Sequence, residues 1–241
     1  MLVKVIFNGT CLNDYFLVSD ISRPLPEFRE KSSEVGGMDG EAFESIVVGT
    51  RECSFKVSSC DKGKSAQQSD ARRLMSILSV RKPALLTFSD ELDKDGVQLK
   101  RYAVPTGKFD AEEYALAGRW TCSFKMHDPF LYGKNRSIVL SSNAHKSVNA
   151  GGNAPSWATA TSCPSGNSYS IVRTGYGFVG FSAPFSGQNV TVDFEAQKVS
   201  VSPSVANASG LQTGSRFFPL EGSMDLVASA QTTLSWTERW L

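Results

Sequence analysis

Residues 189–241 read NVTVDFEAQKVSVSPSVANASGLQTGSRFFPLEGSMDLVASAQTTLSWTERWL. Apolar residues alternate with polar ones over residues 190–194 and again over residues 198–201, with a short polar break between them. Alternation of period two on both sides of such a break predicts a β-hairpin. Residues 224–228 and 234–241 alternate in the same way. The stretch therefore predicts an antiparallel β-sandwich that is closed by its final strand.

The final strand places two tryptophans on one face. Leu234, Trp236 and Trp240 share the same parity, and threonine or serine occupies the intervening positions up to residue 237. Because successive side chains of a strand point to opposite faces, the tryptophans are expected to face the core. We therefore expect Trp236 and Trp240 to be structural core residues, and removal of residues 238–241 to unfold this domain.

Charge divides the chain into two parts. Residues 1–140 hold 20 of the 25 Lys and Arg and 19 of the 24 Asp and Glu, although they are little more than half of the 241 residues. Such a step in composition indicates a domain boundary. We place a linker rich in Ser, Asn and Gly at residues 141–153, between an N-terminal domain (1–140) and a C-terminal domain (154–241).

The N-terminal domain is predicted to be rich in strands, with one helix. The helix is expected over about residues 69–80, capped by Ser69 or Asp70 and stopped before Pro83. Residues 34–40 are expected to form an exposed glycine-rich loop. The fold class is therefore mainly β, with two β-sandwich domains and a helix packed on the first. The apolar face predicted for the helix consists of Ala71, Leu74, Ile77 and Leu78.

Overall charge and targeting signals argue against several classes of protein. The net charge is +1, which does not favour sequence-specific binding of nucleic acid. Residues 1–7 do not form a signal peptide, and no apolar run is long enough to span a membrane. The five cysteines are scattered and odd in number, which favours free thiols in a reducing cytosol over a disulfide framework.

One glycine motif resembles a cofactor loop. Residues 175–180 match GxGxxG, but Pro184 follows four residues later, so no helix can begin there to receive a pyrophosphate. We interpret the motif as an aromatic β-hairpin. The only histidines, His127 and His145, lie outside any ligand-spaced pattern. We therefore expect no cofactor and no metal.

No catalytic set is recognised. Carboxylates cluster at Glu112-Glu113 and at residues 90–95, within a polar hairpin loop expected from Ser89 to Gly96. A solvated charged turn explains both clusters better than a pair of catalytic acids. No G-x-S-x-G nucleophile motif occurs. The protein is not expected to be an enzyme.

A glycan-binding, lectin-like module, possibly used in attachment to a host surface, is the alternative that remains open. Exposed aromatic side chains on the second domain could stack on sugars, whereas buried aromatic side chains would be part of the core. The side chains in question are Trp157, Tyr169, Tyr176 and Phe178.

The chain resembles the distal tail proteins of long, flexible-tailed phages over nearly its whole length. In the first domain the resemblance lies in Asn8-Gly9 after the opening strand, in residues 35–40 and in Asp128-Pro129-Phe130. In the second domain it lies in Gly152-Asn153-Ala154-Pro155 and in the closing residues 236–241.

The resemblance implies a structural virion protein and a galectin-like second domain. Members of that family form a hexameric ring at the end of the tail tube, to which baseplate or tail-tip proteins attach. The implied partners are further copies of the chain, the tail tube protein and these tip proteins, with assembly in the host cytoplasm. A closed ring needs two different faces of the first domain as interface. Our candidate interface residues are Arg23, Gly37, Asp39, Gly40 and Arg51.

Overall fold

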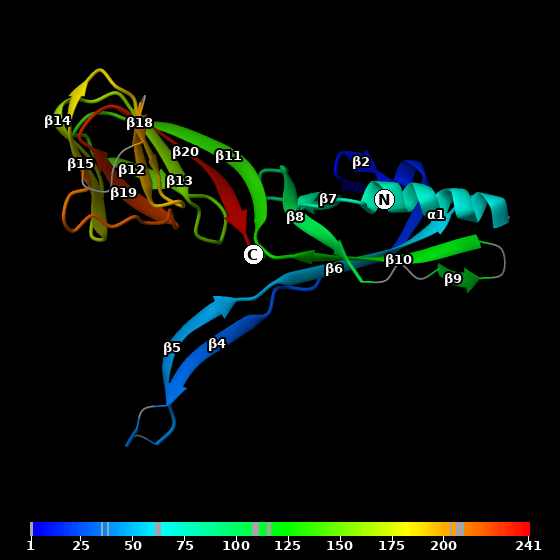
Figure 1. Cartoon of the computed structure of the whole chain (residues 1–241). Helices are drawn as coiled ribbons and strands as arrows, with labels where there is room; N and C mark the ends of the chain where they lie inside the picture. Colours follow the sequence, from blue (N-terminus) through cyan, green and yellow to red (C-terminus); the bar gives the residue numbers. More distant parts are fainter. Residues whose placement is uncertain are drawn as a thin grey trace. The chain divides into compact units, whose positions relative to one another are not determined.

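The computed structural model describes residues 2–34, 36–37, 39–60, 64–107, 111–114, 117–202, 204–205 and 210–241. It is mainly β, and α1 is the single α-helix among these residues (Figure 1). The predicted fold class, mainly β with one helix in the first domain, is confirmed. The chain divides into two compact units, one of residues 1–131 with 241 and one of residues 132–240.

The first unit is built on a single, strongly bent antiparallel sheet. Its strands follow the order β2-β1-β7-β8-β10-β6-β3, and β9 pairs with β10. Its elements are β1 (Val5–Phe7), β2 (Thr10–Cys11), the 3-10 helix η1 (Leu12–Asp14), β3 (Phe16–Ser22), β4 (Phe28–Glu34), β5 (Glu41–Val48), β6 (Arg51–Ser59), α1 (Lys64–Leu78), β7 (Ala84–Leu92), β8 (Gln98–Thr106), β9 (Ala111–Tyr114) and β10 (Ala117–Met126).

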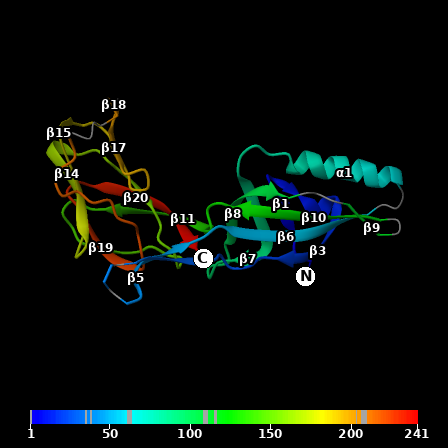
Figure 2. The same ribbon diagram turned by 60° about the horizontal axis from the view of Figure 1, so that its bottom comes forward.

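Helix α1 begins earlier than predicted and ends slightly before its predicted end. It spans Lys64–Leu78 instead of residues 69–80, because residues 65–68 (Ser-Ala-Gln-Gln) include good helix formers. Asp70 therefore lies inside the helix, and its carboxylate accepts a hydrogen bond from the Ser59 hydroxyl. Leu74 is buried, as predicted, in the core beneath the helix. Figure 2 shows α1 lying over the strands of the first unit.

The core of the first unit is aromatic. The Phe124 ring lies 5.0 Å from that of Phe7 and 5.3 Å from that of Phe55. Phe55 contacts Phe88 in turn, with ring centroids 6.3 Å apart. These rings come from β10, β1, β6 and β7, so they bring strands from different parts of the sheet into one core. Contacts of this kind between aromatic rings add to the stability of the core.

The second unit is a sandwich of two antiparallel sheets. One has the order β18-β17-β16-β13-β20-β11 and the other β12-β19-β14-β15, and their apolar faces share one core. Its elements are β11 (Leu131–Leu140), β12 (Lys146–Asn149), β13 (Ala158–Ser162), β14 (Ser165–Arg173), β15 (Gly177–Ser186), β16 (Val190–Asp193), β17 (Lys198–Val201), β18 (Ser204–Val205), β19 (Ser223–Ala228) and β20 (Thr232–Trp240).

The boundary between the units does not follow the step in charge. The units divide between Leu131 and Tyr132, whereas the sequence placed the boundary at 140. The expected linker, residues 141–153, contains β12, which pairs with β19. Strand β11 carries Lys134 and Arg136 but belongs mostly to the second unit, so its charges fall on the N-terminal side of the step in composition.

The closing strand β20 follows the predicted alternation up to Trp236. Trp236 is 5 % exposed, and its indole Nε1 donates to the Ala150 carbonyl at 2.7 Å. The next inward position holds Glu238, which is completely buried and ion-paired with Arg136. Trp240 is only half-buried and lies outside the core, which corrects its expected core role. The apolar row of β20 therefore ends at Trp236.

Candidate assembly surface

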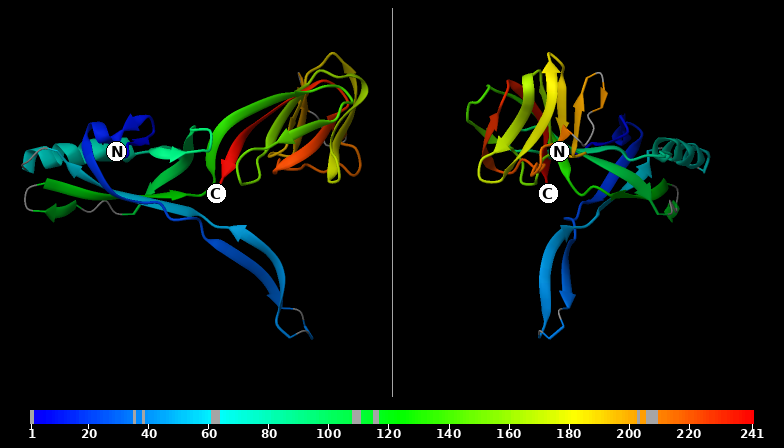
Figure 3. Two further views of the ribbon diagram at one scale, coloured as in Figure 1. Left: turned by 180° about the vertical axis from the view of Figure 1, so that it is seen from behind. Right: turned by 60° about the vertical axis from the view of Figure 1, so that its left-hand side comes forward.

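Strands β4 and β5 form a hairpin that pairs with no other described strand. Figure 3 shows it leaving the sheet of the first unit as an isolated two-stranded ribbon. Phe28, Phe43 and Ile46 on this ribbon are 59 %, 60 % and 61 % exposed. Large apolar side chains clustered on an exposed surface mark a site of interaction with another macromolecule. The hairpin is therefore the strongest candidate for an assembly surface.

The register gives the hairpin two chemically different faces. Directly opposed residues share a face, and successive residues alternate between faces. One face, the acidic face, consists of Phe28, Glu30, Ser32, Glu34, Glu41, Phe43, Ile46 and Val48. The opposite face, the basic face, consists of Arg29, Lys31, Ser33, Ala42, Ser45 and Val47. A β-bulge beside Ser32 leaves Glu44 outside this pairing and keeps both faces continuous.

A charged cluster anchors the base of the hairpin to the sheet of the same unit. Arg23, just after β3, donates two hydrogen bonds to the Asp90 carboxylate, at 2.8 and 2.7 Å. It also lies 3.4 Å from Glu91. On the returning strand, the Arg51 Nε donates to the Pro24 carbonyl at 3.0 Å. The outgoing segment is thus held to β7 through Arg23, and Arg51 at the start of β6 holds it to the returning segment.

Arg101 forms the buried centre of this cluster. It is fully buried on β8, is ion-paired with Glu91, and lies 4.9 Å from the centre of the Phe88 ring. Burial lowers the pKa of Arg101 to about 10 and also lowers the pKa of Arg51. The hydrogen bonds from Arg23 lower the pKa of Asp90. The carboxylate of Asp90 is therefore ionised at neutral pH and holds the base of the hairpin by charge.

The candidate interface residues from the sequence all fall on this hairpin or its base. Arg23 and Arg51 lie together at the base. Gly37, Asp39 and Gly40 lie in the exposed turn at its tip. Gly37 and Gly40 have φ of 88° and 90°, a backbone region that favours glycine. The exposed loop predicted for residues 34–40 is thus the tip of a hairpin, although Val35 and Met38 lie outside the described residues.

The structure gives the other motifs ordinary structural roles. The GxGxxG match at residues 175–180 lies across the β14–β15 turn, which confirms the predicted hairpin. The Nδ1 of His145 contacts the Asp225 carboxylate at 2.5 Å, and that contact lowers the pKa of Asp225. In the described part of the chain, no three His, Cys, Asp or Glu side chains gather in a way that could hold a metal ion.

Both carboxylate clusters differ from their predicted setting. Strand β7 continues to Leu92, so Asp90 and Glu91 are strand residues paired with arginines and do not belong to a solvated loop. Asp93 does form the turn, where its Oδ1 accepts the Val97 backbone N–H at 2.8 Å. The other cluster, Glu112-Glu113, lies in strand β9 rather than in a turn.

The four aromatic residues proposed as a sugar platform do not share a surface role. Tyr169 is buried, and its hydroxyl is hydrogen-bonded to Thr232 at 2.8 Å. Trp157 packs against the core. Tyr176 is partly exposed, but Arg173 and Arg216 lie against its ring at 4.5 and 5.0 Å. Three of the four residues are therefore engaged in contacts within the second unit.

The sequence matches two protein families that lie side by side along the chain. Residues 10–126 match the family described as a phage tail protein RIFT-related domain. Residues 151–240 match the C-terminal domain of the siphovirus-type tail component. The chain belongs to the siphophage distal tail protein family. It is therefore a phage tail component, and its resemblance to this family is confirmed.

Solved structures share the fold over the entire chain. The crystal structure of the Dit protein of phage SPP1, described as a paradigm of the hub adsorption apparatus in phages that infect Gram-positive hosts, matches with a TM-score of 0.83. The sequences are 19 % identical, and the match covers 100 % of both chains. A chain of the activated phage P2 baseplate matches with a TM-score of 0.51 and 8 % identity, over 99 % of this chain and 98 % of that one. No curated protein sequence gave a significant match.

The charged cluster at the base of the hairpin includes residues that sequence reasoning did not identify. The roles of Asp90, Glu91 and Arg101 were not predicted from the sequence. The sequence does contain a signal for Arg101, which lies between Leu99 and Ala103 at an inward position of an alternating strand. A charge at such a position needs a buried partner.

Among the described residues, no helix combines the length and apolar character that crossing a bilayer requires.

Proposed function

We propose that the protein forms a hexameric ring at the distal end of a phage tail tube and serves as the hub to which baseplate or tail-tip proteins attach. The observation that carries this proposal is the β4–β5 hairpin, which exposes Phe28, Phe43 and Ile46 and has no partner strand in the described chain. Membership of the tail protein family and the shared fold with the SPP1 hub protein support the same role.

The hairpin suits the geometry of a ring. In a cyclic assembly each contact joins two different faces of neighbouring subunits, and the rotation must close. A hairpin that extends from its own sheet supplies one such face, and the body of the first unit of a neighbouring copy supplies the other. The anchored base keeps the direction of the hairpin constant, which a closing ring requires.

The role is structural rather than catalytic. Arg51 and Arg101, two buried charged residues of the first unit, lie at the base of the hairpin, and the buried Asp93 accepts backbone N–H groups within the β7–β8 turn. The second unit, a galectin-like sandwich, is the proposed attachment point for tip proteins. Assembly would take place in the host cytoplasm before the protein enters the virion.

Sedimentation velocity of the purified protein, alone and with its tail tube protein, tests the proposal. The expected particle has six times the 26.1 kDa chain mass. Phe43→Ser with Ile46→Ser should abolish it, because these substitutions remove the exposed apolar surface. Val139→Ser serves as a control, since Val139 is an exposed apolar residue of the second unit. A wild-type protein that stays monomeric with the tube protein present would contradict the proposal.

A further inference from the structure

The acidic face of the hairpin carries uncompensated negative charge. None of its three glutamates, Glu30, Glu34 and Glu41, forms an ion pair with a basic residue in the part of the chain that the structure describes. Glu34 and Glu41 are also directly opposed across the two strands. Like charges at opposed positions destabilise a strand pair. This face therefore favours a partner surface that carries positive charge.

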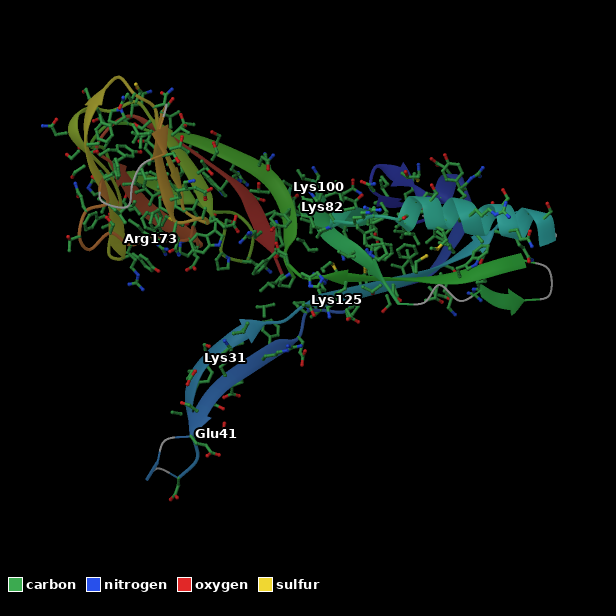
Figure 4. The ribbon with its side chains drawn as sticks, viewed as in Figure 1. Lys31, Glu41, Lys82, Lys100, Lys125 and Arg173 are labelled. Carbon is green, nitrogen blue, oxygen red and sulfur yellow. The ribbon has the colours of Figure 1, made fainter. Side chains whose placement is uncertain are left out.

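The outer face of strand β8 has the complementary chemistry. Lys100, Tyr102 and Val104 point outward from β8, and Lys125 of β10 is directly opposed to Val104. Tyr102 is 49 % exposed, so an aromatic ring lies between the two lysines. Figure 4 shows Lys100 and Lys125 on the strands of the first unit, and Lys31 and Glu41 on the hairpin.

Among the basic side chains on this outer face, Lys100 and Lys125 have no ion pair in the described part of the chain. On the same outer face, Lys56 and Arg119 already share the Asp20 carboxylate, at 3.7 and 2.8 Å. Lys125 lies across from Glu52 on β6 but forms no described ion pair with it. Lys100 likewise has no described carboxylate partner.

The charged positions are equally far apart on the acidic face of the hairpin and on the outer face of β8. Glu30 and Glu34 are four residues apart on one strand, which corresponds to about 13 Å. Lys100 and the position of Lys125 are also four residues apart along β8, again about 13 Å. Each surface has an aromatic side chain between its charges, since Phe43 lies opposite Ser32 in the middle of the acidic face.

We infer that the acidic face of the hairpin of one copy docks on the outer face of β8 and β10 of a second copy. Glu30 and Glu34 would pair with Lys100 and Lys125, and Phe43 would pack against Tyr102. The inference rests on the proposed ring function and names the two surfaces that meet in it. It also explains why the basic face of the hairpin, around Lys31, points away from this contact.

A charge exchange tests the inference. A hairpin variant carries Glu30→Lys and Glu34→Lys, and a sheet variant carries Lys100→Glu and Lys125→Glu. Each variant alone should lose assembly, because like charges then meet at every contact. An equimolar mixture should restore it, since each contact between the two variants again joins opposite charges. An alternating ring of six closes because six is an even number.

Sedimentation velocity would measure the assembly of every variant, and circular dichroism would check that each one is folded. Lys31→Glu, on the basic face, and Lys198→Glu, on the second unit, are matched controls that should assemble like wild type. If wild type forms rings and both charge-reversed variants also do so alone, the docking is wrong and the ring proposal stands. If wild type forms no ring even with its tube protein, the ring proposal fails and the docking fails with it.

Discussion

The β4–β5 hairpin and the closing strand β20 differ in whether their apolar side chains are buried. Both carry large apolar side chains on extended backbone. In β20, Leu234 and Trp236 face a core built by two sheets and are buried. In the hairpin, Phe43 and Ile46 remain mostly exposed because no second layer of the described residues covers them. The comparison shows that the second unit buries the apolar side chains of β20 itself, whereas those of the hairpin remain exposed.

The two regions should therefore respond to substitution in different ways. Truncating an apolar side chain of β20 should cost folding stability. Truncating one on the hairpin should cost assembly and leave the folded monomer nearly unchanged. The predictions below test this contrast, beginning with the largest expected effect.

Trp236→Ala should destabilise the second unit by about 3–5 kcal/mol, the usual cost of removing a buried aromatic side chain. It also leaves the Ala150 carbonyl without its indole donor. Trp240→Ala should cost less than about 2 kcal/mol, because Trp240 is only half-buried. Urea denaturation followed by circular dichroism measures both. Equal losses in the two variants would show that the core extends to the end of β20.

Replacing residues 28–48 with a short glycine linker should change the free energy of unfolding of the monomer by about 1 kcal/mol or less. The reason is that the hairpin adds exposed apolar surface without adding to either core. Assembly should be lost completely. Calorimetry and sedimentation on the same sample measure the two effects. A deletion that unfolds the first unit would mean that the hairpin is an integral part of that unit.

Arg23→Ala should loosen the base of the hairpin at a cost of roughly 1 kcal/mol, since the partly exposed pair with Asp90 is screened by solvent. Limited proteolysis should cut faster near residues 24–27. Arg29→Ala is the matched control, because Arg29 pairs only with Glu27, an exposed neighbour just before β4, in the described ion pairs. If both variants are cut at the same rate, the cluster at the base does not anchor the hairpin.

The smallest expected effect is a dependence on pH. Arg23 lowers the pKa of Asp90, so the ionised carboxylate stabilises the folded state above the unfolded pKa of about 4. That contribution should disappear as pH falls through the still lower folded pKa. Asp90→Asn should therefore be less stable than wild type at pH 7, and the two should converge in acid. Thermal melts across this range measure the difference, and a gap that persists in acid would require another cause.

Part of this contrast was readable from the sequence. The alternation in β20 is readable because Leu234 and Trp236 alternate with Thr233, Ser235 and Thr237. Strand β4 gives no such signal, since Phe28 is the only apolar residue in Phe28–Glu34. Pairing with β5 makes it a strand, and such pairing is a property of two segments together. The exposed loop over residues 34–40 is predicted from the sequence, but the strands on either side of it are not.

The charged residues show a second limit. Arg23 and Arg51 were selected for their place in the chain, and the structure brings them together at the base of the hairpin. The partners of Arg23, which are Asp90 and Glu91, are expected from the sequence to lie in a solvated loop, because a run of acidic residues usually does. Only the pairing of β7 with β8 brings Glu91 to Arg101. Long-range strand register decides such contacts, and local composition does not report it.

Hydrogen–deuterium exchange of the hairpin amides is the most direct test of the central claim, that the β4–β5 hairpin is the surface through which copies of this chain assemble. Exchange would be compared between wild type under assembling conditions and the monomeric Phe43→Ser, Ile46→Ser variant. We predict that amides of residues 28–48 become strongly protected in the assembly while those of β20 exchange equally in both samples. Hairpin amides that exchange at the same rate in the assembled and monomeric proteins would contradict the claim.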